Sequence, residues 1–450
     1  MAAALTVFVA AVFATWYVVV WLVCTLGYIQ LRSRFAYSER SPPVAETKQL
    51  KKQATMTSRT ANSLAKKSFP GVSILRPLKG VDLELRACLA SAFEQDYPAF
   101  ELLLCVDDPA DPAIPIVKSL MQQYAHIPVR LFVGAEDAGV NPKVNNLIKA
   151  YEAAAYDIVW ILDSNCWVVP STLKTSIATF ERDRRIELVH HLPLCVAVEP
   201  RGWGARLDEM FLSTAHAKFY VAINTVAVAS CIMGKSNLFR KSTLDAIDPS
   251  GLRPYSKYIA EDQTIGEAIW HHGGLHAMAS EAVIQPVGAN ILADYFFRRM
   301  RWLRVRKYIV TAATLVEPMT ESLFCGAMGT FAASVLIGSN PFAFFITHMI
   351  IWCMLDYWIF RQLHGANYSL NDIPTASSFA TPTLSPPYFA RPRAATAIAC
   401  GLPAWLKAWL LREFLALPIW ITAMSGTKIE WRTKEFKILP DSTAVIVSRS

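Results

Sequence analysis

Acidic residues follow directly on two short apolar runs of the sequence. Leu102–Val106 leads through one further aspartate into Asp108, and Ile158–Leu162 leads into Asp163. Carboxylates in such positions can hold a divalent cation against a diphosphate. Open α/β sheets bind ligands beyond the carboxyl ends of their strands, so both aspartates are candidates for one site. A single aspartate of this kind can equally cap the following turn, but two in one sheet favour a binding site.

A third acidic position, Glu261–Asp262, lies where the sequence pattern predicts the start of a helix. Ile265, Ala268 and Ile269 follow it with helical spacing. We interpret Asp262 as a candidate general base that accepts the proton of a hydroxyl group. The structural alternative is that Asp262 stabilises the start of the helix through the helix dipole.

The segment Arg298-Arg299-Met300-Arg301-Trp302 combines basic and aromatic side chains. On a helix, Arg298, Arg301 and Trp302 share one face. Guanidinium groups suit bidentate binding of a diphosphate. The alternative is an interfacial helix, because six of the ten residues 298–307 are basic and an apolar stretch follows. Both interpretations can hold together.

Other classes of site are excluded or disfavoured by the sequence. Met233-Gly234-Lys235-Ser236 resembles the end of a phosphate-binding P-loop, but that motif needs glycine where Ala229 stands. The nine cysteines form no CxxC motif, which argues against structural zinc and a disulfide framework. A formal net charge of +8 without a recognisable module argues against binding to nucleic acid.

Alternating elements must position these residues. Between residues 70 and 306 we predict a doubly wound, largely parallel α/β sheet, because short apolar runs alternate with segments of helical spacing. The predicted strands are Val72–Leu75, Glu101–Val106, Val129–Val133 and Asp157–Leu162. The predicted helices between them are Leu83–Gln95, Ile114–Tyr124 and Lys143–Ala154.

Hydrophobic segments at both ends predict a membrane protein. Of all residues, 53% are hydrophobic and only 18% are charged. Residues 1–31 are expected to form a transmembrane helix, and the basic residues after it predict a lumenal N-terminus. The further expected units are a polar linker at 38–68, a catalytic domain at 70–306, an interfacial helix with two transmembrane helices at 307–363, a Pro/Ser-rich loop at 364–395, and a membrane-associated helix and tail at 396–450. Within the last unit, Trp405–Met424 is interrupted by charges and a proline, which favours a kinked or interfacial helix over a plain span.

Six segments, in this order, resemble the ceramide glucosyltransferase (glucosylceramide synthase) family. They are Val72-Ser-Ile-Leu-Arg-Pro-Leu-Lys-Gly80, Cys105-Val-Asp-Asp108, Asn141-Pro-Lys-Val-Asn-Asn146, Trp160-Ile-Leu-Asp-Ser164, Ile259-Ala-Glu-Asp262 and Arg298 with Arg301-Trp302. The resemblance covers about residues 70–320 and extends to Trp431-Arg-Thr433 near the end.

The resemblance implies a GT-A-like fold and transfer of glucose from UDP-glucose to the primary hydroxyl of ceramide, with inversion to a β-glucoside. It also implies a Golgi or ER membrane and a site that faces the cytosol. Asp108 would contact the nucleotide, and Asp163 would hold a divalent cation, Mn²⁺ or Mg²⁺, with the diphosphate. Asp262 would be the base. The remaining expected site residues are Lys143, Arg298, Arg301 and Trp302 at the diphosphate, and His216 and Glu261 on the acceptor side.

Two departures qualify these expectations. Many related transferases carry Asp-x-Asp where this chain has Asp163-Ser-Asn165, which makes a weaker metal site. Processive polysaccharide synthases usually have glutamine where Arg298 stands, and they need more membrane spans than the three or four expected here. A processive synthase or a polyprenyl-phosphate sugar transferase is the alternative within the same fold. A membrane scaffold or transporter is the alternative outside it, but it leaves the acidic residues at the strand ends unexplained.

Overall fold

A seven-stranded mixed sheet forms the centre of the α/β part of the chain. Its order is β3-β2-β1-β4-β6-β5-β7. β6 runs antiparallel to both neighbours, and the other pairings are parallel. The strands are β1 (Val72–Leu78), β2 (Phe100–Val106), β3 (Val129–Val133), β4 (Ile158–Leu162), β5 (Ile186–Ala197), β6 (Ser236–Arg240) and β7 (Leu275–Val287). The predicted doubly wound mixed α/β sheet is therefore confirmed, and all four predicted strands are present.

Helices cover both faces of this sheet because successive residues of its buried strands point to opposite sides. In β2, Leu102 and Leu104 pack into one core, and Leu103 and Cys105 pack into the other. The first core is closed by α3 (Leu85–Phe93), α4 (Ala113–Gln123) and α6 (Thr172–Phe180). The second is closed by α5 (Pro142–Glu152), α9 (Lys241–Ile247), the 3₁₀ helix η1 (Arg253–Lys257) and α10 (Glu261–His271).

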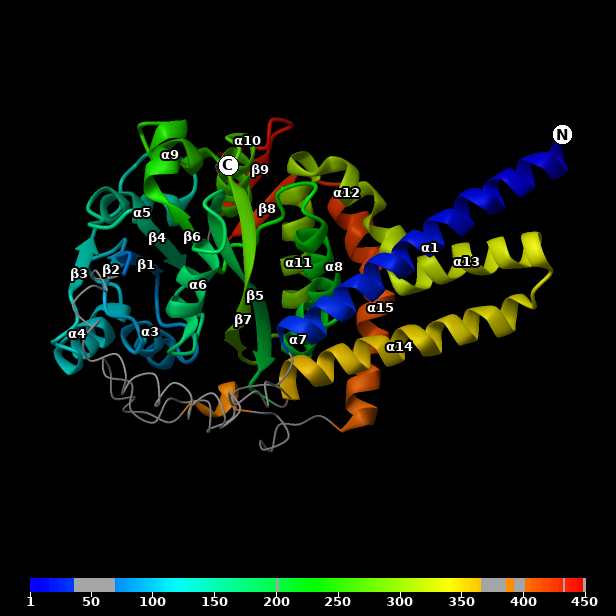
Figure 1. Cartoon of the computed structure of the whole chain (residues 1–450), viewed down its shortest axis with the longest axis horizontal. Coiled ribbons are helices and arrows are strands. Elements are labelled where there is room, and N and C mark those ends of the chain that lie inside the picture. Colours follow the sequence, from blue (N-terminus) through cyan, green and yellow to red (C-terminus); the bar gives the residue numbers. More distant parts are fainter. Residues whose placement is uncertain (36–68, 200–201, 366–385, 392–400, 432–433, 448–450) are drawn as a thin grey trace, which may run out of the picture.

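Three apolar helices lie side by side and extend away from the sheet (Figure 1). They are α1 (Ala2–Arg34), α13 (Ser322–Ile337) and α14 (Pro341–Gly365). α1 and α14 are long and apolar enough to cross a membrane. α13 is a third candidate if it is joined to the preceding α12 (Thr311–Val316) and η2 (Glu317–Thr320), from which it is bent by 70°. A turn at Gly338, whose φ of 65° favours glycine, connects α13 to α14.

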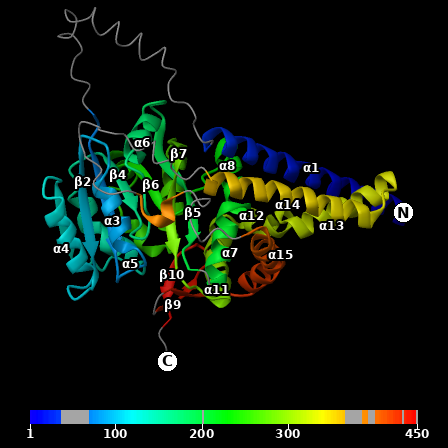
Figure 2. The same ribbon diagram turned by 90° about the horizontal axis from the view of Figure 1, so that it is seen from below.

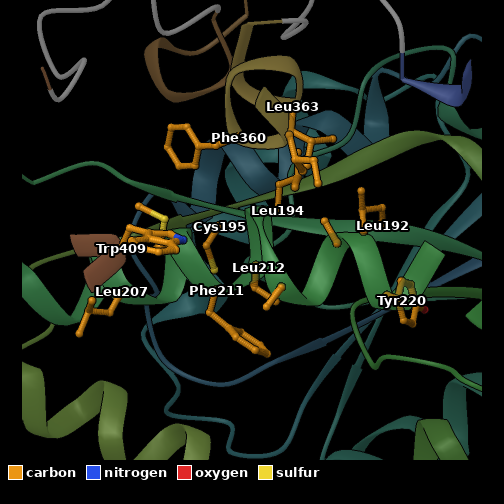
Figure 3. Close-up of a cluster of buried hydrophobic side chains, with 14 of the residues drawn as sticks. Leu192, Leu194, Cys195, Leu207, Phe211, Leu212, Tyr220, Phe360, Leu363 and Trp409 are labelled. Atoms are coloured by element: carbon orange, nitrogen blue, oxygen red, sulfur yellow. The ribbon is translucent and has the colours of Figure 1, made fainter. Parts of the chain in front are cut away.

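Four further helices connect the sheet to this bundle, namely α7 (Trp203–Ser213), α8 (Ala215–Val226), α11 (Leu292–Ile309) and α15 (Leu402–Met424). They run across the direction of α1, α13 and α14 (Figure 1), and Figure 2 shows the same arrangement from below. Their apolar side chains join strand β5 and α14 in one large core (Figure 3). Leu194, Phe211, Tyr220, Phe360 and Trp409 belong to it and come from five different elements. The α/β part and the helical bundle are therefore continuous.

The end of the chain forms a small antiparallel sheet that the sequence analysis did not anticipate. Its strands are β8 (Lys428–Trp431), β9 (Lys434–Ile438) and β10 (Ala444–Ile446). Phe436 and its neighbours pack against Val305 of α11. Val140 and Ile259, which precede α5 and α10, pack against the same cluster.

The computed structural model describes residues 1–35, 69–199, 202–365, 386–391, 401–431 and 434–447. The linker predicted at 38–68 lies outside these residues, as does most of the loop predicted at 364–395. Of that loop, 386–391 are described, and they contain a short 3₁₀ helix, η4 (Tyr388–Ala390), which packs against Trp167 through Phe389.

Candidate active site

The carboxyl ends of β1, β2 and β4 meet at one edge of the sheet because the three strands are parallel. Asp108 follows β2 and Asp163 follows β4 at this edge. Asp108 is exposed, and its Oδ1 accepts a hydrogen bond of 2.8 Å from the backbone N–H of Ala110. β1 lies between the two strands, and their register sets Asp163 level with Cys105, so Asp108 lies two strands across the sheet and three residues further along it.

Asp163 carries an ion pair on each carboxylate oxygen. Lys143 Nζ lies 2.8 Å from Oδ1, and Lys235 Nζ lies 3.1 Å from Oδ2. Burial alone would raise the pKa of Asp163, but the two ammonium groups outweigh burial and lower it. Asp163 is therefore a fixed negative charge between two fixed positive charges.

Lys143 is presented by the first turn of α5. Asn141 caps this helix, because its Oδ1 accepts hydrogen bonds from the backbone N–H groups of Lys143 and Val144, and Pro142 takes the first helical position. Burial would lower the pKa of Lys143, but Asp163 and Glu261 outweigh it and raise the pKa. The ammonium group is thus charged and held at the helix N-terminus.

Glu261 connects α5 to α10. Its Oε1 lies 2.8 Å from Lys143 Nζ, and its Oε2 accepts a hydrogen bond of 2.9 Å from Asn141 Nδ2. The side chain is buried. These contacts place the Glu261 carboxylate beside Lys143, which also contacts Asp163.

Asp262 is the next residue of the same first turn. Burial and the neighbouring Glu261 carboxylate raise the pKa of Asp262 to about 7, against the opposing effect of Lys143. Gly234 lies directly beside the Asp262 carboxylate. A partly buried carboxyl group with a pKa near neutrality has the property that a general base needs.

Lys235 is the residue of this cluster that sequence reasoning missed. β6 runs antiparallel to β4, so its first residue, Ser236, pairs with the last residue of β4, Leu162. The residue before β6 therefore lies beside the residue after β4, and Asp163 N donates to Lys235 O over 3.0 Å. The search for residues that follow strands could not find a residue that precedes one. In the sequence analysis, Lys235 appears only within the segment that was rejected as a P-loop.

The basic face of α11 is divided between two surroundings. Arg298 Nη1 lies 3.0 Å from Oδ2 of the buried Asp208, and its guanidinium lies 5.2 Å from the Trp302 ring centre. Burial would lower the pKa of Arg298, but Asp208 raises it, and Asp163 adds to this effect. Arg301 follows one turn later and is partly buried.

Arg299 contacts the helix break at η2 and helix α7. Its Nη2 lies 3.3 Å from Glu317 Oε1, and its guanidinium lies 3.4 Å from the ring centre of Phe211. A small pocket lies beside it, where α7, α11 and α15 meet the helix break at η2. The lining residues include Arg299, Glu321, Arg412, Ile419 and Trp420.

His216 lies on α8, next to a chain of aromatic rings. Its ring stacks on that of Tyr220, with 4.9 Å between centres, and Tyr220 Oη lies 2.7 Å from His190 Nδ1. Burial lowers the pKa of His216 to about 3, so its imidazole is neutral. Burial raises the pKa of Tyr220, and the Asp262 charge contributes to that shift. His216 is therefore linked through Tyr220 to His190 of β5.

The acidic residues do not form a complete metal site by themselves. Within the part of the chain that the structure describes, no group of three His, Cys, Asp or Glu side chains is arranged to hold a metal ion. The donor set at Asp163 consists of one carboxylate and the Asn165 amide oxygen, which lies 3.5 Å from Lys235 Nζ. Mg²⁺ is often bound by one or two carboxylates together with substrate phosphates. One carboxylate and one amide are too few ligands for such a cation on their own, and both oxygens of Asp163 are paired with lysines, so a cation here would depend on the oxygens of a bound diphosphate.

Taken together, the arrangement can bind an anion and remove a proton. Lys143 and Lys235 offer two ammonium groups at the sheet edge, and Arg298 extends positive charge from α11. Asp262 is the carboxyl group of this cluster whose pKa is raised to about 7. A group that leaves as a diphosphate and a hydroxyl that attacks would meet between them.

The chain matches the model of glycosyl transferase family 21 over residues 43–444. A ceramide glucosyltransferase from Komagataella phaffii is 39% identical, with 95% of this chain and 90% of the relative covered. A ceramide glucosyltransferase from Pyricularia oryzae is 36% identical, with 96% of this chain and 94% of the relative covered. Among solved structures, a mannosyltransferase from Pyrobaculum calidifontis in complex with GDP-Man and Mn²⁺ matches with 17% identity and a TM-score of 0.40, covering 76% of this chain and 97% of that one.

Proposed function

The chain belongs to glycosyl transferase family 21 and is a ceramide glucosyltransferase, which transfers glucose to ceramide; we propose that UDP-glucose is its donor and that transfer inverts the anomeric configuration. Membership of this family, over nearly the full length of the chain, replaces the alternatives of a processive synthase and of a scaffold or transporter. The observation that carries the mechanism is the raised pKa of Asp262 beside a lysine–carboxylate cluster.

Asp262 is proposed as the general base. Its carboxyl group, with a pKa of about 7, is half deprotonated near neutral pH and can take the proton of the ceramide hydroxyl as the oxygen attacks the anomeric carbon. Glu261 is held by Lys143 and Asn141, so its part is to fix Lys143 and to raise the pKa of its neighbour.

The diphosphate is proposed to bind between the lysines and α11. Lys143, Arg298, Arg301 and Trp302 are its proposed ligands, as the resemblance implies, and Lys235 is added because of its contact with Asp163. The two ammonium groups stabilise the negative charge that develops on the departing UDP. Asp108, two strands away at the exposed end of the same edge, is proposed to contact the nucleotide.

A divalent cation, Mn²⁺ or Mg²⁺, is proposed to bind at Asp163 together with the diphosphate. Asn165 is its second candidate ligand from the chain. When bound, the cation would supply positive charge at the leaving group. The diphosphate needs this additional positive charge, because the charges of Lys143 and Lys235 are already neutralised by those of Asp163 and Glu261.

The acceptor is proposed to approach from the membrane helices along α8. His216 is neutral, and its Nδ1 has no hydrogen-bond partner among the described residues. A neutral imidazole nitrogen can accept a hydrogen bond from the amide or a hydroxyl of the ceramide head group, and because Nδ1 is buried, the head group would reach it only when neighbouring side chains move aside. The position of His216 at the start of α8, between Phe211 of α7 and Tyr220, supports this acceptor-side role.

The membrane orientation is a further proposal. Arg32 and Arg34 end α1 at the side where the α/β part lies, and the N-terminus and the α13–α14 turn lie at the opposite end of the bundle (Figure 1). By the positive-inside rule the α/β part faces the cytosol and the N-terminus faces the lumen. We propose the Golgi or ER membrane as the location.

The deciding experiment measures donor and acceptor specificity on the purified protein. UDP-glucose, UDP-galactose and GDP-mannose are each offered with ceramide, with diacylglycerol or without a lipid. The expected product is glucosylceramide from UDP-glucose and ceramide, and NMR of its anomeric proton should show the β-configuration. An α-anomer, or equal use of another nucleotide sugar, would contradict the proposal.

A further inference from the structure

An ion pair without any exposure joins α8 to the membrane helices. Lys218 Nζ lies 2.6 Å from Asp356 Oδ1, and both side chains have 0% exposure. Trp409 of α15 donates a hydrogen bond of 3.0 Å from Nε1 to the other oxygen, Asp356 Oδ2. The Lys218 ammonium also lies 4.2 Å from the ring centre of Trp352. Three helices, α8, α14 and α15, therefore meet at one carboxylate.

Such a pair is a costly way to obtain stability alone. Removing two charges from water carries a desolvation penalty, and well-packed apolar residues of similar volume often stabilise a protein equally well or better. A buried pair does, however, define geometry, because its attraction and hydrogen bonds are satisfied in one relative position of the helices. The Lys218–Asp356 pair is thus better explained by the position that it imposes.

The opposite side of α8 carries His216 and Tyr220. His216 and Tyr220 are four residues apart and share one face of the helix, whereas Lys218 lies about 200° around the axis from His216. The rings of His216 and Tyr220 stack, and Tyr220 contacts His190 of β5. One side of α8 is therefore tied to α14 and α15, and the other carries His216, the residue proposed for the acceptor side, with Tyr220.

α1 restricts the same part of α8 from a third direction. A β-carbon at Gly27 would lie 2.2 Å from the backbone oxygen of Lys218, so the two helices touch through their backbones. Any shift of α8 along or around its axis would break this contact as well as the ion pair. The segment around Lys218 is therefore the point at which α8 is held.

We propose that Lys218 and Asp356 are positioning residues that set the His216–Tyr220 face of α8 relative to Asp262, so that ceramide is oriented for attack. The proposal rests on the proposed function of Asp262 and His216. It assigns to a charge pair among the membrane helices an effect on the acceptor and none on the nucleotide sugar.

The test uses the full-length protein in nanodiscs and the double variant Lys218→Met/Asp356→Leu, which replaces the pair by apolar side chains of similar size. We expect the KM for ceramide to rise at least 5-fold. The Kd for UDP, measured by calorimetry, should stay within 2-fold of the parent value, and the thermal midpoint should stay within a few degrees of it. The single variant Lys218→Arg, which keeps a positive charge beside Asp356, should have a ceramide KM much closer to that of the parent. The matched control Arg253→Met/Glu152→Leu removes an exposed pair remote from α8 and should change nothing.

Unchanged ceramide KM and kcat in the folded double variant would overturn the proposal, and so would an equal loss of UDP affinity. Trp409→Phe keeps an aromatic ring but removes the hydrogen bond to Asp356, so it tests the same idea if the double variant does not fold. Here a rise of about 2- to 5-fold in ceramide KM supports the proposal, and parental kinetics contradict it. Turnover of the parent enzyme with UDP-glucose tests the proposed function. The ratio of the ceramide KM of the variant to that of the parent tests the role of the ion pair. A failure of the proposed function can therefore be distinguished from a failure of the positioning proposal.

Discussion

Gly234 leaves the space that the Asp262 carboxylate occupies, since a β-carbon at position 234 would lie 2.8 Å from Asp262 Oδ2. The contact joins the segment before β6 to the first turn of α10. The proposed base is therefore positioned from two sides. Its own helix, α10, holds it on one side, and Gly234, which has no side chain, leaves room for its carboxylate on the other.

This contact predicts the effect of Gly234→Ala. The added methyl group would push the Asp262 carboxylate away from its place, so kcat should fall by about 10- to 100-fold while UDP still binds. Asp262→Asn should cost about 10²–10⁴-fold, the usual contribution of a general base. Gly273→Ala is the control for a glycine substitution, because no atom lies within 4 Å of a β-carbon there, although its φ of 96° makes a small loss of stability expected. Normal turnover in Gly234→Ala would show that the Asp262 carboxylate does not need its observed position to act in catalysis.

The pKa of Asp262 predicts the pH profile. The base acts only when it is deprotonated, so kcat should rise with pH and level off above an apparent pKa of about 7. Glu261 raises the pKa of Asp262, so Glu261→Gln should move this acid limb to lower pH. Stopped assays across pH 5–9 would measure it. A profile that stays flat between pH 5 and 8 would exclude Asp262 as the titrating base.

Lys235 is predicted to bind the donor. Lys235→Met removes one of the two ammonium groups on Asp163, so the Kd for UDP should rise by about 10-fold, equivalent to about 1.4 kcal/mol. Calorimetry with UDP measures this directly. Lys241→Met, a lysine on the surface of α9, serves as the control. Equal Kd values for Lys235→Met and the parent would remove Lys235 from the site.

The proposed cation predicts a response to chelation. After treatment with EDTA, turnover should fall and recover on addition of Mn²⁺ or Mg²⁺, because the cation offsets the charge of the leaving diphosphate. Electron paramagnetic resonance of Mn²⁺ should show binding that needs UDP and is weakened in Asp163→Asn. Full activity after exhaustive chelation, with no Mn²⁺ bound in the presence of UDP, would contradict the assignment.

Arg298 and Arg301 are predicted to fail in different ways. Arg298→Ala leaves the carboxylate of Asp208, which is 1% exposed, without its ion pair, so we expect a loss of about 3–5 kcal/mol of stability. Arg298→Ala/Asp208→Asn should recover part of it. Arg301→Ala should mainly weaken UDP binding. Thermal unfolding and calorimetry separate the two effects, and an unchanged thermal midpoint in Arg298→Ala would show that its pair with Asp208 is dispensable.

Local sequence patterns located much of the fold and the candidate site. Asp163 and Asp262 were found because the first follows and the second lies at the start of an element whose apolar pattern is strong. The helix predicted from Leu83 begins only at Leu85, because Glu84 adopts a left-handed φ of 57° that no pattern reveals.

The remaining features depend on long-range contacts. Lys235 joins the site only through the antiparallel pairing of β6 with β4. The different surroundings of Arg298 and Arg299 depend on α7 and on the helix break at η2. Apolar periodicity describes one segment at a time, so it cannot tell which buried charges face each other.

The small sheet formed by β8, β9 and β10 bears on the placement of the proposed base. Phe436 and Ile438 pack with Val305 of α11 and with Ile259, three residues before Asp262. Three distant parts of the sequence therefore share one apolar cluster, so a substitution in this sheet can reach the first turn of α10 without touching any proposed site residue.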